Sequence, residues 1–244
     1  MDRVGKSLWP GVRKRMVLLV DMERRPGATD EEVREERGDF VRMLAQLSGE
    51  ECRVLNYTKV GPKVVRRLKP SAIVLSGQGT PWFEYPPEEL EGIRQVALDP
   101  PCKLLGICGG HQFLAMCFGA PICTMRLALP GEPTASDPNW RWFPFYKGWF
   151  KEEGFVEVRV TRPEDPLFAG LPERIVVHQS HFWEVKRLPK GFLLLATNRN
   201  CRIQAMRHRS RPIYGVQFHP ERFDEEHPHG RMVLENFLRL PEGG

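Results

Sequence analysis

The chain has 244 residues, of which 41% are hydrophobic and 27% are charged. This composition is that of a globular protein with a sizeable core, and it excludes a disordered chain. No apolar run approaches the roughly 20 residues that cross a bilayer, and the first residues lack the apolar stretch of a secretory signal. We therefore expect a cytoplasmic protein with no membrane partner.

The formal net charge of +5 raises the question of nucleic-acid binding. Most basic residues are interleaved with acids, as at 31–37, and such mixtures are typical of solvated helix faces. Short basic clusters occur only at 13–15 and 207–211. Because these clusters are small, we expect no nucleic-acid partner.

The first part of the chain alternates buried strands with helices. Thr29 and Glu32 form a capping-box pattern, which begins a helix whose apolar face extends to Leu47. Strands are predicted at 16–20, 53–55, 71–75 and 103–107, and further helices around 64–68 and over 111–118. This alternation predicts a doubly wound parallel sheet.

The pattern changes after about residue 150. Alternating segments near 155–160, 175–177, 193–196 and 203–206 indicate antiparallel strands, before a strand at 212–218 and a closing helix at 232–238. We predict a single domain over 1–244 of the α/β class. Its mostly parallel, doubly wound sheet is flanked by helices and carries a small antiparallel β extension.

Residues 127–150 form an insert that is rich in proline and aromatic residues. One interpretation is a long loop that packs its own aromatic side chains on the body of the protein. The other is a lid or a surface for a partner, because long loops in compact domains are often functional.

The cysteines, at 52, 102, 108, 117, 123 and 201, suggest neither a disulfide framework nor a zinc site. His227 and His229 flank a proline with no third ligand at hand, so we expect no metal and no cofactor. Cys108 differs from the other cysteines. It lies in Gly-Ile-Cys-Gly-Gly between a predicted strand and a predicted helix, which is the setting of a nucleophile elbow. A helix N-terminus there favours the thiolate.

A second motif supplies partners for this thiol. His219 follows the predicted strand at 212–218, and Glu221 stands two residues further on. Open α/β sheets keep their sites at the carboxyl ends of strands, and a carboxylate can orient an imidazole that serves as a base. We therefore predict a catalytic triad of Cys108, His219 and Glu221.

These motifs resemble those of the class I, or triad, glutamine amidotransferases, which have a flavodoxin-like fold. The resembling segments are Leu-Leu-Gly-Ile-Cys-Gly-Gly-His-Gln at 104–112 and Tyr-Gly-Val-Gln-Phe-His-Pro-Glu at 214–221. The similarity covers most of the chain and is closest to the glutaminase domain of GMP synthetase. It implies hydrolysis of glutamine through a γ-glutamyl thioester, with ammonia passed to a synthetase chain.

The resemblance also implies further site residues. The backbone N–H groups of Gly109 and Gln78, with Gly77 beside them, would form an oxyanion hole. Gln112 and the backbone of Ser180 and His181 match positions that hold the substrate glutamine. These residues are Gly77, Gln78, Gly109, Gln112, Ser180 and His181.

The sequence departs from the family pattern at two places near these residues. The expected oxyanion loop reads Ser-Gly-Gln-Gly-Thr-Pro at 76–81, and Trp183 stands where GMP synthetases have an aspartate. Two alternatives therefore stay open beside a stand-alone glutaminase. One is a γ-glutamyl peptidase or hydrolase that acts alone on other γ-glutamyl compounds. The other is a non-catalytic binding module on the same fold.

Overall fold

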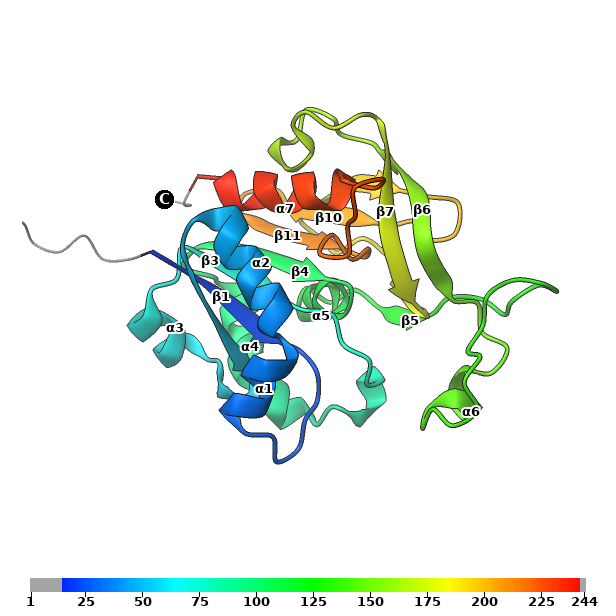
Figure 1. Cartoon of the computed structure of the whole chain (residues 1–244), viewed down its shortest axis with the longest axis horizontal. Coiled ribbons are helices and arrows are strands. Elements are labelled where there is room, and N and C mark those ends of the chain that lie inside the picture. Colours follow the sequence, from blue (N-terminus) through cyan, green and yellow to red (C-terminus); the bar gives the residue numbers. More distant parts are fainter. Residues whose placement is uncertain (1–14, 242–244) are drawn as a thin grey trace, which may run out of the picture.

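The computed structural model describes residues 15–241. These residues form a nine-stranded mixed sheet and a separate two-stranded one, with helices packed on both faces of the large sheet (Figure 1). The strands are β1 (Met16–Asp21), β2 (Glu51–Asn56), β3 (Ala72–Leu75), β4 (Lys103–Ile107), β5 (Ile122–Thr124), β6 (Glu152–Val160), β7 (Arg174–His181), β8 (Trp183–Val185), β9 (Phe192–Thr197), β10 (Ala205–His208) and β11 (Ile213–Val216). The helices are α1 (Asp30–Glu36), α2 (Gly38–Ser48), α3 (Pro62–Leu68), α4 (Pro87–Leu98), α5 (Gly109–Cys117), α6 (Phe143–Tyr146) and α7 (His229–Arg239), with 3-10 turns η1 (Tyr57–Lys59), η2 (Trp82–Glu84) and η3 (Pro166–Phe168).

The large sheet has the order β2-β1-β3-β4-β11-β10-β9-β6-β7. Its first half, from β2 to β11, is parallel, and its second half, from β11 to β7, is antiparallel. The predicted α/β class, with a parallel sheet and an antiparallel extension, is therefore confirmed. The extension continues the same sheet. The separate small sheet pairs β5 with β8.

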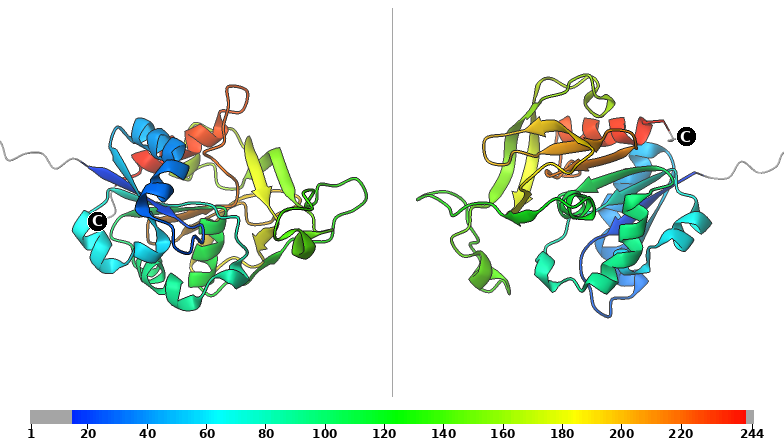
Figure 2. Two further views of the ribbon diagram at one scale, coloured as in Figure 1. Left: turned by 60° about the horizontal axis from the view of Figure 1, so that its bottom comes forward. Right: turned by 180° about the vertical axis from the view of Figure 1, so that it is seen from behind.

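Alternate residues of the central strands pack into two different hydrophobic cores, one on each face of the sheet. On β1, Val17 and Leu19 pack with α1, α2 and α7, whereas Leu18 and Val20 pack with α3, α4 and α5. The rear view of Figure 2 brings this second layer of helices, coloured cyan to green, to the front. Burial on both faces explains why these strands are continuous apolar runs in the sequence.

The first predicted helix is wrong in its length. The capping box of Thr29 and Glu32 is present, but the helix ends at Glu36 and a second one begins at Gly38. Arg37 separates them because its backbone leaves the helical conformation, and its guanidinium pairs at 2.7 Å with Asp21 at the end of β1. The predicted apolar face nevertheless packs into one core.

Helix α4 and strand β8 have no counterpart in the elements predicted from the sequence. The insert at 127–150 contains the short helix α6 and stands out from the sheet beyond β5 (Figures 1 and 2). A bridge between Leu127 and Trp149 closes its base. The prediction that residues 1–244 form one domain stays a prediction.

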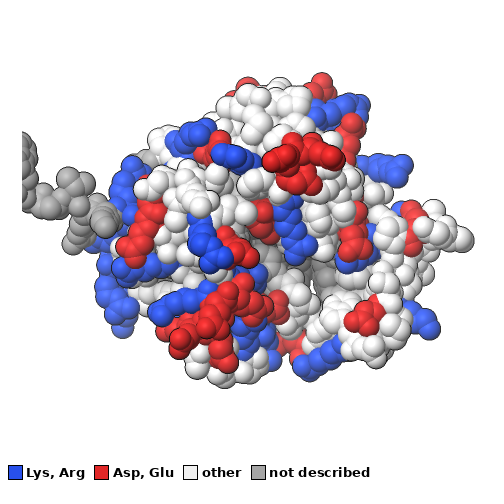
Figure 3. Space-filling view, viewed as in Figure 1, with Lys and Arg blue, Asp and Glu red and all other residues white. Residues whose placement is uncertain are grey.

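Charged side chains of both signs are interleaved on the face shown in Figure 3. In the basic clusters, Arg15 pairs with Glu50, Arg207 pairs with Asp165, and Arg211 donates to a backbone carbonyl. Residues 13 and 14 of the first cluster lie outside the described part of the chain. Within residues 15–241, no helix is both long enough and apolar enough to cross a membrane.

Candidate active site

Cys108 occupies a strained turn between β4 and α5. Its φ of 48° and ψ of −102° are unusual for a residue with a side chain. The neighbouring glycines are required by close packing. A Cβ on Gly106 would lie 2.5 Å from the carbonyl oxygen of Gly110, and one on Gly110 would lie 2.6 Å from that of Leu75. The turn thus holds the sulfur at the N-terminus of α5, as the elbow pattern predicted.

His219 and Glu221 follow β11, the strand that pairs with β4. The backbone N–H of His219 donates to the carbonyl of His178 at 2.8 Å, which fixes the residue against β7. Its Nδ1 lies 2.7 Å from Oε1 of Glu221. Burial lowers the pKa of His219, but the charges of Glu221 and Cys108 and hydrogen bonds to both raise it to about 10. The imidazole is therefore protonated at neutral pH.

Gly77, in the loop after β3, lies next to both the cysteine motif and the histidine motif. A Cβ added to Gly77 would lie 2.9 Å from Cε1 of His219 and 3.4 Å from Cβ of Cys108. The imidazole and the thiol therefore border the same small space. The positions predicted for the nucleophile, its base and the orienting carboxylate come together at the carboxyl edge of the sheet.

The two segments predicted to form an oxyanion hole are also in contact. A Cβ on Gly109 would lie 2.7 Å from Cγ and 3.1 Å from the backbone nitrogen of Gln78. The glycine at 109 thus allows the loop after β3 to approach the elbow. Among the described residues, no acceptor is found for the backbone N–H of Gln78 or that of Gly109.

Gln112 lies at the cavity but is only 2% exposed, and its amide is engaged by the protein. Its Oε1 accepts from the indole of Trp82 at 2.8 Å, and its Nε2 donates to the carbonyl of Trp183 at 2.9 Å. Nε2 also donates at 3.2 Å to Gln217, whose own amide lies 3.7 Å from the sulfur of Cys108. Gln217 was missed in the sequence. A polar residue inside the apolar run at the end of β11 was the signal that marked it.

Ser180 and His181 reach the site in different ways. The carbonyl oxygen of Ser180 lies 4.0 Å from Sγ of Cys108. The ring of His181 turns away into a buried network, where Nδ1 is 2.9 Å from the carbonyl of Trp183 and Nε2 is 3.1 Å from Glu152. His181 lines the cavity while its ring is engaged in this network, and the predicted role of its backbone stays a prediction.

Glu152 is the centre of this buried network. Its side chain is 1% exposed and accepts hydrogen bonds from His181, Asn198, Asn200 and Gln204. Burial raises the pKa of Glu152, but the bonds and charge of His181 and the two asparagine amides lower it more, so that it lies below its ordinary value. The network fixes the end of β7 beneath the site.

A cavity of about 450 Å³ opens over the thiol and the imidazole. Its walls come from the turn after β1 on one side and from the insert on the other. The side chains that line these walls include Glu23, Arg37, Trp140, Tyr146, Phe182 and Trp183. The insert is thus part of the site.

The insert is attached to the body through an aromatic cluster. The ring of Tyr146 stacks on Phe182 with centroids 4.5 Å apart and on Trp140 at 5.1 Å. Its hydroxyl oxygen lies 2.5 Å from Nε1 of Trp183. The tryptophan that replaces an aspartate of the family pattern is therefore an anchoring point for the insert.

The two histidines weighed as metal ligands have separate partners. His227 stacks on Phe155 at 3.8 Å and contacts Asp224 at 2.8 Å, while Nδ1 of His229 accepts the backbone N–H of Val176 at 3.0 Å. Within residues 15–241, no group of three or more His, Cys, Asp or Glu side chains is placed to hold a metal ion.

Comparison with known proteins gives a consistent picture. The family model for glutamine amidotransferase class-I matches residues 40–240. The glutamine-hydrolyzing GMP synthase subunit of Pyrococcus abyssi is 34% identical over 197 residues, which cover 77% of this chain and 89% of the relative. The protein of the same name from Methanocaldococcus jannaschii is 31% identical over 198 residues, which cover 77% and 88%.

Solved structures share the fold. A crystal structure of a provisionally assigned GMP synthase subunit from Thermoplasma acidophilum has a TM-score of 0.68 at 25% identity and covers 93% of this chain and 94% of that one. A glutamine amidotransferase from Thermotoga maritima has a TM-score of 0.55 at 19% identity and covers 86% and 77%.

Proposed function

The chain belongs to the class-I glutamine amidotransferase family and is an enzyme of that kind, and from this premise we propose that Cys108, His219 and Glu221 hydrolyse glutamine to glutamate and ammonia. The thiolate of Cys108 attacks the γ-carboxamide carbon, and the C–N bond breaks as His219 protonates the departing ammonia. Water, deprotonated by His219, then attacks the γ-glutamyl thioester and releases glutamate and the thiolate. Glu221 orients the imidazole and stabilises its charged form.

The observation that carries this proposal is the position of Gly77 against both His219 and Cys108. Residues that are more than a hundred positions apart border one space because β4 and β11 are neighbours in register. The raised pKa of His219 supports an imidazolium that is ready to donate a proton. A binding module would have no need for this combination of strained thiol, imidazole and carboxylate.

The remaining predicted residues receive supporting roles in the proposal. The N–H groups of Gly109 and Gln78 stabilise the tetrahedral oxyanion, and the loss of one such donor typically costs about 10²–10³ in turnover. The backbone of Ser180 and His181 borders the substrate. Gln112 supports the site indirectly, because its amide donates hydrogen bonds to the carbonyl of Trp183 and to the side chain of Gln217 and holds both residues in place.

The ammonia is proposed to serve a synthetase partner. Relatives that match over more than two thirds of this chain are named as a glutamine-hydrolyzing subunit of GMP synthase. We therefore expect a synthetase chain of the GMP synthase type to receive the ammonia. Addition of such a chain should stimulate glutamine hydrolysis.

The test is release of glutamate from glutamine by the purified chain, alone and with a synthetase partner. We expect Cys108→Ala to abolish the release and Cys123→Ala, at an exposed cysteine, to leave it unchanged. γ-Glutamyl dipeptides serve as competing substrates. Equal activity of Cys108→Ala and the unmodified chain contradicts the proposal, and so does a preference for dipeptides by orders of magnitude.

A further inference from the structure

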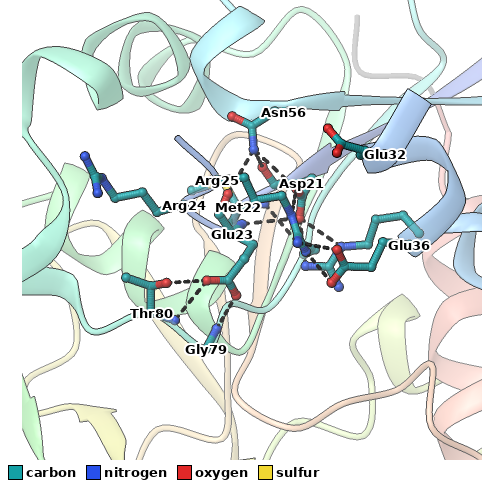
Figure 4. A network of polar contacts seen from close by, with 12 residues as sticks. Asp21, Met22, Glu23, Arg24, Arg25, Glu32, Glu36, Asn56, Gly79 and Thr80 are labelled. Atoms are coloured by element: carbon teal, nitrogen blue, oxygen red, sulfur yellow. Dashed lines mark hydrogen bonds and ion pairs between the residues drawn. The ribbon is translucent and has the colours of Figure 1, made fainter. Parts of the chain in front are cut away.

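We infer that Glu23 is a positioning residue that fixes the loop of the proposed oxyanion hole, an inference that rests on the proposed function. Glu23 lies in the turn after β1, and Gly79 is 56 residues further along the chain. Figure 4 shows the carboxylate of Glu23 directed toward Gly79 and Thr80. The carboxylate therefore connects the turn after β1 with the loop after β3.

Both oxygens of the Glu23 carboxylate accept hydrogen bonds from that loop. Oε2 accepts the backbone N–H of Gly79 at 2.5 Å. Oε1 accepts the backbone N–H of Thr80 at 3.0 Å and also its hydroxyl. Hydrogen bonds to an ionised acceptor are about twice as strong as those between neutral groups. Glu23 thus anchors the chain directly after Gln78.

Other groups anchor the chain directly before Gln78. The hydroxyl oxygen of Ser76 accepts the backbone N–H of Met22 at 3.0 Å. The guanidinium of Arg37 donates to the carbonyl oxygen of Gly77 at 3.4 Å. Gln78 therefore lies between two anchored points.

The hydroxyl of Ser76 donates to the carbonyl oxygen of Gly77 at 2.8 Å, which is the loop's own anchor before Gln78. Gly77 and Gly79 flank this residue, and neither has a side chain that could hold the backbone. Gly77 is required there, because a Cβ would approach His219. Glycine loses more conformational freedom on ordering than any other residue. A fixed direction of the Gln78 N–H therefore needs an anchor on the side of Gly79 as well, which Glu23 provides.

Glu23 is itself held in place. Its backbone N–H donates to Oδ1 of Asp21 at 3.3 Å, and its carbonyl accepts from the amide of Asn56 at 2.9 Å. Asp21 is fully buried and pairs with Arg25 at 3.0 Å and with Arg37 at 2.7 Å. Figure 4 shows this network beside Glu23. A rigid turn makes the carboxylate a fixed reference point for the loop.

The negative charge of Glu23 and its hydrogen bonds to the loop have opposite effects on the stability of the oxyanion. A negative charge near the hole disfavours the oxyanion of the reaction, whereas the anchoring of the loop favours it. Glu23→Gln separates the two effects. Glutamine has nearly the same shape but only one oxygen, so its NH₂ group would face the N–H of either Gly79 or Thr80.

The experiment compares the unmodified chain with Glu23→Gln, Glu23→Asp and the matched control Glu31→Gln, which removes the same charge from an exposed position on α1. The readouts are kcat and KM for glutamine and the rate of Cys108 alkylation by iodoacetamide. Alkylation needs the thiolate but no oxyanion hole. We expect Glu23→Gln to lower kcat by about 10-fold to 100-fold, less than the loss of a whole donor, with little change in KM or alkylation.

Glu23→Asp keeps both oxygens and should recover part of the lost kcat, while Glu31→Gln should behave like the unmodified chain. An unchanged or increased kcat in Glu23→Gln overturns the inference. A parallel loss of alkylation rate also overturns it, because the effect would then be a general disruption of the site. Failure of the proposed function would give a different result. The unmodified chain would then release no glutamate, or Cys108→Ala would release as much glutamate as the unmodified chain. Either result would contradict both proposals.

Discussion

Tyr146 and Trp183 are joined by a contact of 2.5 Å between the phenol oxygen and the indole nitrogen. Burial raises the pKa of Tyr146 to about 12, so the phenol stays neutral at physiological pH and its oxygen accepts the indole N–H. The contact ties the insert to β8, whose backbone borders the cavity. The insert and the strand therefore form one wall of the site.

Tyr146→Phe removes this contact while it keeps the ring that stacks on Phe182. We expect the free energy of unfolding to fall by about 1 kcal/mol. We expect KM for glutamine to rise while kcat changes little, because this wall lines the cavity in which glutamine is proposed to bind, whereas the proposed triad lies at the carboxyl edge of the sheet. Denaturant titration and steady-state kinetics measure the two effects. Glu31→Gln, at an exposed position on α1, is the control, and an unchanged KM in Tyr146→Phe contradicts the prediction.

Glu221→Gln should change the pH dependence of hydrolysis. The Glu221 carboxylate raises the pKa of His219, so its loss lowers that pKa. The protonated imidazole is needed for departure of ammonia, so kcat/KM falls as the pH rises through the pKa of His219. For the unmodified chain this fall lies near pH 10, and for the variant it moves to lower pH.

Turnover at neutral pH should also drop by about 10³-fold or more in Glu221→Gln, as expected when an orienting carboxylate is lost. Asp224→Asn is a matched control, because Asp224 pairs with a different histidine, His227. Its pH profile should coincide with that of the unmodified chain. Identical alkaline limits in Glu221→Gln and the unmodified chain would contradict the assigned role.

Gly77→Ala should abolish most of the activity without unfolding the protein. The added Cβ would lie 2.9 Å from Cε1 of His219, so the imidazole must move. Displacement of a reacting group by about 1 Å can cost about 10²-fold in rate. In the control Gly38→Ala, the added Cβ meets only the flexible end of Arg42, at 3.2 Å. Glutaminase assays measure the activity, and circular dichroism shows whether the variant is folded. Full activity in Gly77→Ala would be incompatible with the geometry.

Glu152→Gln should destabilise the fold, because it leaves Nε2 of His181 without its carboxylate partner. A buried donor that loses its hydrogen-bond acceptor costs about 1–3 kcal/mol. The pKa of Glu152 is lowered in the fold, so its stabilisation is complete at neutral pH and is lost as the pH falls through that lowered pKa.

The difference in unfolding free energy between Glu152→Gln and the unmodified chain should therefore shrink in acid. Chemical denaturation at several pH values measures this difference. Glu153→Gln, at an exposed neighbour on β6, should have little effect at any pH. A difference that stays constant from neutral to acid pH would argue against an ionised Glu152.

Much of the fold could be predicted because buried strands and capped helices have local signatures. Strand β1 is an apolar run from Met16 to Val20, β4 continues after Lys103 as Leu-Leu-Gly-Ile, and the capping box of Thr29 and Glu32 is local. The break at Arg37 was not predicted, although the residue that follows it is Gly38 and glycine is unfavourable inside a helix. Helix α4 was missed although it has local signals, namely proline and two glutamates in its first turn and buried apolar residues at helical spacing, Ile93, Val96 and Ala97.

The residues of the candidate site also fall into those that a local motif predicts and those that it does not. Cys108 and His219 stand in contiguous motifs at strand ends, so the parallel sheet predicts that they meet. The hydrogen bond from Gly79 to Glu23 and the network around Glu152 join segments whose contact no local pattern specifies. Trp183 was noticed only as a departure from the family pattern, and its bond to Tyr146 supplies the physical reason.

The pairing of β4 with β11 sets the separation of the segments that carry the proposed nucleophile and base, because Gly106 lies opposite Gly215 and Ile107 opposite Val216 in one ladder. Loops can therefore lengthen, shorten or change sequence around the cavity without altering that separation. The insert between β5 and β6 lines the cavity from outside this ladder, so a change there alters the wall of the cavity and leaves the register of β4 and β11 as it is.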